Sequence, residues 1–236
     1  MPKKKKAKKS KKTSISKKKI AGVIAGTIIA GSSFWILKSG KHKVLFPAYS
    51  SIRVFDGDTF LTKEKESVRL ASLDAPEEGY CGDKQATKLL KKLVENKPLY
   101  IKTIYVDNNK RLVSYVYSSE GLINVQMVKS GWARAHTIKD SQREALITAS
   151  KYAKENELGI YSSLCFSKEP EKKGCDIKGN IRSGYKTKIY IFPGCISYTN
   201  TKVEKDLGDR WFCTEAEAKK AGFKKSSGCP DSVKRK

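Results

Sequence analysis

Three short segments rich in β-branched and aromatic residues lie at residues 52–55, 60–62 and 68–72, and turn-forming residues separate them. This pattern predicts short β-strands joined by tight turns. Among the charged side chains of the same stretch, a set of five lies within 22 positions, namely Asp56, Asp58, Arg69, Asp74 and Glu77. Loops often use Asp, Gly and Pro, but they rarely combine several carboxylates with an arginine between apolar flanks. The stretch therefore indicates a chemical site built on short strands rather than an ordinary polar loop.

The residue types in this stretch indicate which chemistry it supports. Asp58 and Asp74 offer hard carboxylate oxygens, which calcium prefers. Arg69 has a planar, permanently charged guanidinium suited to a phosphate group, and Glu77 is a carboxylate able to take a proton from water. A divalent cation and guanidinium groups stabilise the negative charge that gathers on phosphate oxygens during hydrolysis. The sequence therefore predicts metal-assisted hydrolysis of a phosphodiester.

The net charge of +25 is concentrated at the two ends of the chain. Residues 44–166 are nearly balanced, whereas residues 1–43 hold no acid and residues 167–236 carry a net charge of +8. Basic ends suit anionic partners such as nucleic acid, anionic lipid or an anionic surface polymer. Solubility alone is the alternative explanation.

The N-terminal segment predicts a membrane anchor. Residues 1–19 contain 11 lysines and are expected to form a basic cytoplasmic tail, and residues 20–37 follow without a charge. Eighteen helical residues span about 27 Å, close to the thickness of a bilayer core. Lysines before such a span keep the N-terminus in the cytoplasm, so we expect a single-pass protein of the cell membrane whose remaining residues lie outside the cytoplasm. A cleavable signal peptide, and hence secretion, is the alternative.

The six cysteines fit a location outside the cytoplasm, where disulfides persist. Their number is even and none forms a C-x-x-C pair, so the spacing supports disulfides better than a zinc site. Two cysteines lie in residues 44–166 and four lie in residues 167–236, which suggests pairing within each part. The six are Cys81, Cys165, Cys175, Cys195, Cys213 and Cys229.

Hydrophobic periodicity predicts further elements after residue 72. The predicted helices cover residues 83–95, 122–129 and 141–157. The predicted strands cover residues 99–106, 112–117 and 132–136. This order predicts an α+β fold in which a small β-barrel carries helices on its outside, and an OB-fold is the candidate architecture.

Residues 50–165 resemble the thermonuclease, or staphylococcal-nuclease-like, family. The resemblance rests on V-F-D-G-D-T at residues 54–59, V-R-L at 68–70, L-D-A-P-E at 73–77 and an arginine that follows an Asp-led turn. It implies an OB-fold nuclease domain at residues 44–166 with calcium-dependent phosphodiesterase activity on DNA and RNA. It implies no protein partner.

The resemblance also assigns a metal site residue by residue. It implies that Asp58, Asp74 and the backbone carbonyl of Ala75 bind calcium. Asp56 is then expected to lie near the metal behind these ligands, and Thr59 is expected to support the site by hydrogen bonding.

Three catalytic residues and one disulfide follow from the same resemblance. Arg69 and Arg111 are implied to be two phosphate clamps, and Glu77 holds the position of the general base. Some exported members of the family carry one cysteine at the start of the first helix and another just past the last helix. A disulfide between Cys81 and Cys165 is therefore implied.

Two places depart from the family pattern. Asn109 and Lys110 stand where an aromatic residue and a glycine often precede the second arginine, and Thr137 and Lys139 stand where some members have tyrosines. These changes affect base stacking and nucleotide preference but leave the predicted metal and phosphate groups in place. The histidines form no zinc or triad pattern, and His136 is predicted to be a structural or surface residue.

The C-terminal part predicts a small second domain. Residues 167–173 are charged and are predicted to be a linker, and residues 174–232 hold four cysteines that would staple a small α+β unit. Thr214 followed by Glu217 predicts a capping box at the start of a helix. The unit resembles a small module often appended to bacterial nucleases. Its basic character suits a nucleic-acid backbone or an anionic surface polymer, and a structural role is equally compatible.

Two alternatives compete with a membrane-anchored nuclease. The first is a non-catalytic nucleic-acid-binding OB module tethered to the membrane, and the presence of the five site residues Asp58, Arg69, Asp74, Glu77 and Arg111 argues against it. The second is a surface protein whose basic ends hold wall polymer or lipid. The sequence leaves open the preference between DNA and RNA, and between internal and terminal cleavage.

Overall fold

The computed structural model describes residues 49–136, 141–182 and 187–230. The predicted basic tail (1–19), the predicted membrane span (20–37) and the positions Thr137 and Lys139 lie outside the described residues. No helix within the described ranges is long and apolar enough to cross a membrane. The described residues all belong to one unit that runs from Leu45 to Lys236.

The first sheet forms because short runs with buried apolar side chains, such as Phe60, Val68 and Leu70, pair across tight turns. Its order is β1-β2-β3-β6-β5, with β3 and β6 parallel, the other neighbours antiparallel, and β7 paired to β6. Its strands are β1 (Ser51–Val54), β2 (Thr59–Thr62), β3 (Ser67–Leu70), β5 (Tyr100–Val106), β6 (Leu112–Ser118) and β7 (Gly121–Leu122). Tyr49 and Leu99 exchange two backbone hydrogen bonds of 2.8 and 2.9 Å, which draw the two edges of the sheet together.

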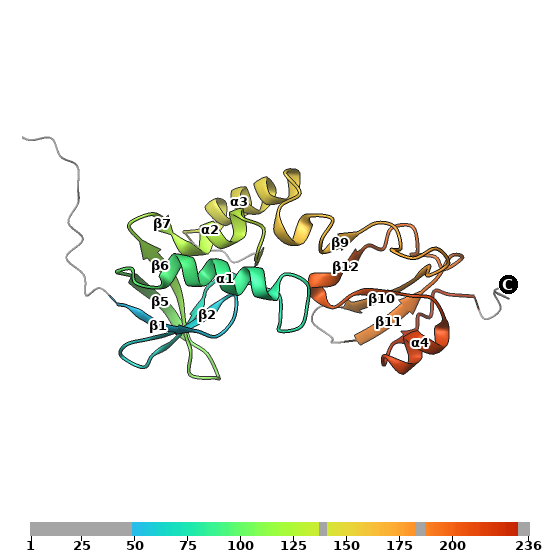
Figure 1. Cartoon of the computed structure of the whole chain (residues 1–236), viewed down its shortest axis with the longest axis horizontal. Coiled ribbons are helices and arrows are strands. Elements are labelled where there is room, and N and C mark those ends of the chain that lie inside the picture. Colours follow the sequence, from blue (N-terminus) through green and yellow to red (C-terminus); the bar gives the residue numbers. More distant parts are fainter. Residues whose placement is uncertain (1–48, 137–140, 183–186, 231–236) are drawn as a thin grey trace, which may run out of the picture. The chain divides into compact units, whose positions relative to one another are not determined.

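Three helices cover this sheet: α1 (Asp83–Val94), α2 (Ile123–Lys129) and α3 (Arg143–Glu155). In Figure 1, α2 lies between α1 and α3, and it also packs on β6. The helices bury the residues that recur at helical spacing, which in α1 are Ala86, Leu90, Leu93 and Val94. The predicted α+β class is confirmed, and the predicted helices begin and end within two residues of the observed ones.

The C-terminal part forms a second sheet of order β13-β10-β11-β14, and a separate pair joins β12 to β9. Its elements are β9 (Phe166–Ser167), β10 (Ile177–Arg182), β11 (Thr187–Ile191), β12 (Val203–Glu204), η2 (Lys205–Leu207), β13 (Arg210–Phe212), α4 (Glu215–Lys220) and β14 (Lys224–Lys225). The predicted capping box is present, because Thr214 Oγ1 accepts from the Glu217 amide at 3.1 Å and the Glu217 carboxylate accepts from the Thr214 amide at 3.4 Å. Ser167, the first residue of the predicted linker, lies in β9 and pairs with Val203.

All six cysteines lie in the described residues, and all are paired. The implied Cys81–Cys165 disulfide is present. The other two disulfides join Cys175 to Cys213 and Cys195 to Cys229. The prediction that cysteines pair within each part is therefore confirmed.

A buried lysine organises the C-terminal sheet. Lys178 is 5% exposed, and its ammonium donates to the carbonyl oxygens of Tyr198 (2.8 Å) and Thr201 (2.7 Å). The same ammonium lies 4.2 Å from the ring centroid of Tyr198 and 5.4 Å from that of Trp211. Burial lowers the pKa of Lys178. These aromatic rings therefore hold an internal cation rather than presenting a free stacking surface.

Candidate active site

The turn between β1 and β2 places Asp58 at the end of the sheet. Asp56 Oδ1 accepts from the Asp58 amide at 2.9 Å, a local bond that tightens the turn. A Cβ at Gly57 would lie 2.6 Å from the Cβ atoms of Ala75 and Ala86, so only glycine fits this approach. The turn is consequently pressed against α1 and against the loop that follows Asp74.

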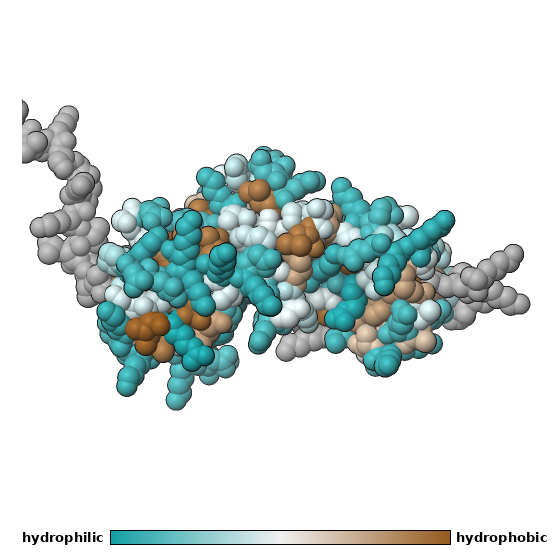
Figure 2. All heavy atoms as spheres, viewed as in Figure 1, coloured by the Kyte–Doolittle hydropathy of each residue, from teal (hydrophilic) through white to brown (hydrophobic). Residues whose placement is uncertain are grey.

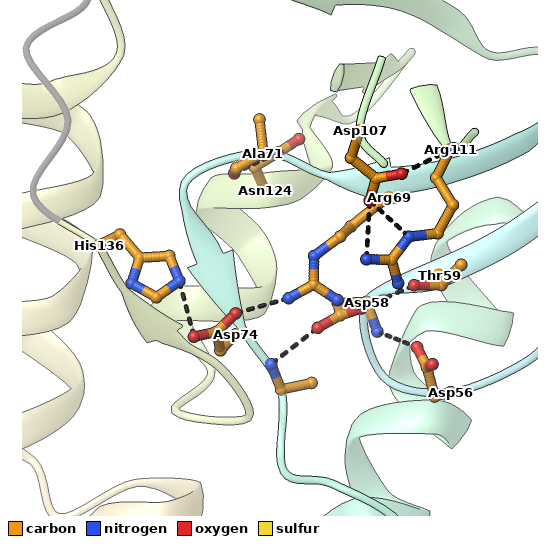
Figure 3. A network of polar contacts seen from close by, with 11 residues as sticks. Asp56, Asp58, Thr59, Arg69, Ala71, Asp74, Asp107, Arg111, Asn124 and His136 are labelled. Atoms are coloured by element: carbon orange, nitrogen blue, oxygen red, sulfur yellow. Dashed lines mark hydrogen bonds and ion pairs between the residues drawn. The ribbon is translucent and has the colours of Figure 1, made fainter. Parts of the chain in front are cut away.

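Arg69 bridges Asp58 and Asp74 (Figure 3). One guanidinium nitrogen lies 2.6 Å from Asp58 Oδ1, and the other terminal nitrogen lies 2.5 Å from Asp74 Oδ1. Asp58 also accepts from Thr59 Oγ1 at 2.8 Å and from the Ala75 amide at 3.2 Å. The carboxylates predicted to bind metal therefore lie on the two sides of one guanidinium.

The pKa values of Asp58 and Asp74 are shifted in opposite directions. Asp58 is 5% exposed, and burial raises its pKa to about 6 even though the Arg69 guanidinium acts to lower it. Burial also acts to raise the pKa of Asp74, but the hydrogen bond and charge of His136, together with Arg69, outweigh it and leave that pKa below its usual value. Asp74 is thus the more strongly acidic of the pair.

His136 is the partner of Asp74 that the sequence did not indicate. Its Nε2 lies 2.7 Å from Asp74 Oδ2, as Figure 3 shows. The contact arises because β4 (Leu73–Asp74) pairs antiparallel with β8 (Arg134–Ala135), and the His136 amide donates to the Ser72 carbonyl at 2.8 Å. The hydrogen bond to Asp74 raises the pKa of His136. The sequence predicted a short strand here but carried no signal for its partner.

The turn between β5 and β6 positions Arg111. Asp107 accepts from the Arg111 amide at 2.9 Å, from Arg111 Nε at 2.8 Å and from the Asn109 amide at 2.9 Å. The hydrogen bond from the Arg111 amide is the largest of the effects on the pKa of Asp107, which lies below its usual value. Asp107 was predicted only as the first residue of the turn, and the structure shows that its carboxylate also orients the arginine.

A cleft of about 940 Å³ joins these groups. Asp58, Arg69, Ala75, Glu77 and Arg111 all line it. Glu77 is exposed, and its carboxylate makes no hydrogen bond with any residue that the structure describes. The structure therefore brings an uncommitted carboxylate and two arginines into one cavity, with Asp74 held at its edge by Arg69.

The oxygens available to a divalent cation are few. No cluster of three or more His, Cys, Asp or Glu side chains suited to a metal occurs among the described residues. Asp58, Asp74 and the carbonyl of Ala75 are hard oxygen donors that suit calcium better than zinc. Three donors are fewer than calcium takes, so a hard cation held here would draw its remaining ligands from water or phosphate oxygens. Arg69 lies between the two carboxylates and pairs with both of them.

Comparison with known proteins identifies a family and several relatives. The profile of the family described as staphylococcal nuclease homologue matches residues 67–163. An uncharacterized endonuclease of Haemophilus influenzae is 31% identical over 150 residues, which cover 62% of this chain and 81% of that protein. A probable staphylococcal-like nuclease of Oryza sativa subsp. japonica is 30% identical over 125 residues, covering 52% of this chain and 37% of that protein. An uncharacterized endonuclease of Escherichia coli is 27% identical over 115 residues, covering 47% of this chain and 74% of that protein.

Proposed function

Because this chain belongs to the staphylococcal nuclease family, we propose that it is a calcium-dependent phosphodiesterase that hydrolyses DNA, RNA or both. The family and its endonuclease relatives support nuclease activity. The observation that supports calcium-dependent hydrolysis of a phosphodiester in particular is the Arg69 bridge between Asp58 and Asp74. It gathers the carboxylates and guanidinium of a phosphodiester site at one end of the sheet.

Calcium is proposed to be held by Asp58, Asp74 and the carbonyl of Ala75. When bound, it would supply positive charge to the phosphate oxygens during hydrolysis. Asp56 supports this arrangement through the Asp58 amide, and Thr59 supports it through the Asp58 carboxylate. The first contact tightens the turn that carries Asp58, and the second holds the Asp58 carboxylate itself.

The phosphate is proposed to be held by the two arginines. Arg69 and Arg111 line the same cleft from different strands, so they can contact different oxygens of one phosphate. A phosphate would replace a carboxylate as the acceptor of Arg69. Asp107 keeps Arg111 oriented by accepting from its Nε. Removal of one such donor typically lowers the rate by about 10²–10³.

Glu77 is proposed to be the general base. It lines the cleft and is exposed, so it can reach a water molecule next to the phosphate. Taking one proton from that water would make the oxygen a better nucleophile at phosphorus. The leaving oxygen then departs from the opposite side of the phosphate, and the arginines stabilise the charge that develops meanwhile.

The fold and the cellular location of the protein are further parts of this proposal. The strand order, the parallel β3–β6 pair and the approach of the two edges at Tyr49 and Leu99 support an OB-type barrel within the nuclease domain (44–166). Three disulfides support a location outside the cytoplasm. We propose that residues 20–37 anchor the chain in the cell membrane and that residues 174–232 form an appended module; secretion after cleavage is the alternative.

The test is cleavage by the purified full-length chain. Single-stranded DNA, double-stranded DNA and RNA are each incubated with calcium and with a chelator. We expect calcium-dependent cleavage that falls by about 10² or more in Glu77→Gln and Arg69→Ala, whereas Lys151→Ala on the exposed side of α3 retains the wild-type rate. Binding of DNA without cleavage under any condition would instead make this a non-catalytic binding module.

A further inference from the structure

The cleft extends beyond the proposed catalytic groups along one face of α1. Lys84, Lys88 and Lys91 line it, and their spacing of four and three residues places them on the same side of the helix. All three side chains are exposed. None of their ammonium groups forms an ion pair or hydrogen bond with a residue that the structure describes. These lysines are therefore available to an anionic ligand in the cleft.

Asp83 directly precedes the lysine row and is one of several acidic residues that line the cleft. Its carboxylate accepts from the backbone amides of Gly79 and Lys84. It thus serves the start of α1 rather than neutralising the lysine row. The side of α1 that faces the viewer in Figure 1 is covered in Figure 2 mainly by hydrophilic side chains.

An aromatic ring lines the same cleft. Phe55 is 45% exposed, and the guanidinium of Arg53 lies 5.2 Å from its ring centroid. The amide of Phe55 donates to the Thr59 carbonyl at 2.9 Å, so the ring is carried by the turn that holds Asp58. An exposed aromatic face accepts an unpaired base by stacking, and a nearby arginine adds to that attraction.

We propose that Phe55 and the lysines of α1 extend the proposed site along a bound polynucleotide, beyond the phosphate that is cleaved. Phe55 stacks on an unpaired base, and the lysines of α1 contact phosphates beyond the one that is cleaved. Stacking requires a base that is not already paired, which favours single strands over duplexes. The row from Lys84 to Lys91 rises about 10 Å along the helix, a length that a mononucleotide does not fill. This inference rests on the proposed function, because it takes the cleaved phosphate to lie at Arg69.

The first test measures binding without cleavage. The full-length chain is titrated into a fluorescent 12-nucleotide single strand in chelator, over a range of salt concentrations. A variant with three Lys→Gln changes on α1 should bind about tenfold more weakly. The slope of log binding constant against log salt concentration should become shallower by about two, since each phosphate contact contributes about 0.7 to that slope. Phe55→Ala should bind about tenfold more weakly with an unchanged salt dependence. The three changes are K84Q, K88Q and K91Q.

A second triple variant controls for the loss of charge. Lys92 and Lys129 line a separate groove between the helices, and Lys151 is exposed on α3. Changing these three to Gln removes the same net charge without touching the cleft, so binding should change little. Equal weakening in both triple variants would overturn the proposal, because it would show general attraction by net charge. Equal affinity of the wild type for single strand and duplex would overturn the stacking role.

Cleavage separates this inference from the proposed function. With calcium, the wild-type kcat/KM should be higher for the 12-nucleotide strand than for a small substrate, a nucleoside nitrophenyl phosphodiester. The α1 lysine variant should lose this advantage of the strand while cleaving the small diester normally. Equal efficiency on both substrates would overturn the inference alone. Failure to cleave either substrate would overturn the proposed function, and the binding titration would still decide whether the cleft holds a strand.

Discussion

Arg134 holds the buried carboxylate of Asp206 through two hydrogen bonds, from Nε at 2.6 Å and from a terminal nitrogen at 2.9 Å. The same terminal nitrogen lies 3.2 Å from Glu204. Arg134 belongs to β8, where it pairs with Asp74 in the proposed site. Asp206 belongs to η2 in the C-terminal part. Two ion pairs of Arg134 therefore tie the C-terminal part to the strand that borders the proposed metal site.

The backbone reinforces this link at the first disulfide. The Lys205 amide donates to the Cys165 carbonyl at 2.8 Å, and the Lys205 carbonyl accepts from the Cys81 amide at 3.3 Å. The short helix η2 thus contacts both cysteines of the Cys81–Cys165 disulfide. The C-terminal part consequently contributes to the frame of the site.

Replacing Arg134 by Ala should lower the free energy of unfolding by about 3 kcal/mol. Asp206 has only 2% of its side chain exposed, so the change leaves a buried carboxylate without its guanidinium. Urea unfolding at neutral pH measures the effect. The control is Lys151→Ala, which breaks an exposed pair with Glu155 (3.6 Å) and should change stability by about 0.5 kcal/mol or less. Equal effects of the two changes would contradict the buried role of Asp206.

Removing the Cys81–Cys165 disulfide with two Cys→Ser changes should lower the free energy of unfolding by about 2–4 kcal/mol. The two cysteines are 84 positions apart, so the bond restricts a long stretch of the unfolded chain. Denaturant unfolding of the oxidised proteins is the measurement. The equivalent change at Cys195 and Cys229, separated by 34 positions, serves for comparison. An unchanged midpoint in the first variant would contradict a stabilising role for this bond.

Asp209 should make stability fall as pH rises from about 4 to about 6. Burial raises its pKa from 3.8 to about 6, although it accepts from the Ile181 amide at 2.7 Å and from Asn180 at 2.8 Å. The folded protein therefore binds this proton more tightly than the unfolded chain. The resulting stability is complete below the unfolded pKa and is lost as pH rises through the folded pKa.

Asp209→Asn isolates this contribution, because Asn does not titrate. We expect the difference in unfolding free energy between wild type and variant to be larger at pH 4.5 than at pH 7.5, by on the order of 2 kcal/mol. Urea unfolding at both pH values gives the difference. A constant difference would contradict a raised pKa, because it would show that the hydrogen bonds to the carboxylate fully offset its burial.

Calcium should raise the thermal unfolding temperature of the wild type, because a ligand that binds only the folded state stabilises it, by about 2.7 kcal/mol at 100 times its Kd. Asp58→Asn and Asp74→Asn should abolish this increase. Asp107→Asn, which alters a carboxylate outside the proposed ligand set, should retain it. Calorimetry in calcium, in magnesium and in chelator makes the comparison. Persistence of the calcium effect in both Asp58→Asn and Asp74→Asn would exclude the proposed ligands.

Patterns in the amino-acid sequence were enough to predict much of the local structure and the residue types of the proposed site. Runs of β-branched and aromatic residues and helical periodicity predicted the longer strands and the helices between residues 51 and 155 to within a few residues, since both patterns act over neighbouring positions. Thr214 and Glu217 predicted their capping box for the same reason. The family motifs singled out Asp58, Arg69 and Asp74, which the structure places in contact, while their catalytic roles remain predictions.

Contacts between residues that are distant in the sequence could not be predicted in this way and depend on the folded arrangement. His136 reaches Asp74 because β8 pairs with β4, and no local pattern encodes that pairing. Arg134 reaches Asp206 across 72 positions, and the last four cysteines had several possible pairings. Such contacts depend on how sheets and helices pack together after they form, so residue spacing alone does not determine them. The shared cleft arises in the same way, because its lysines, aromatic ring and arginines come from separate elements.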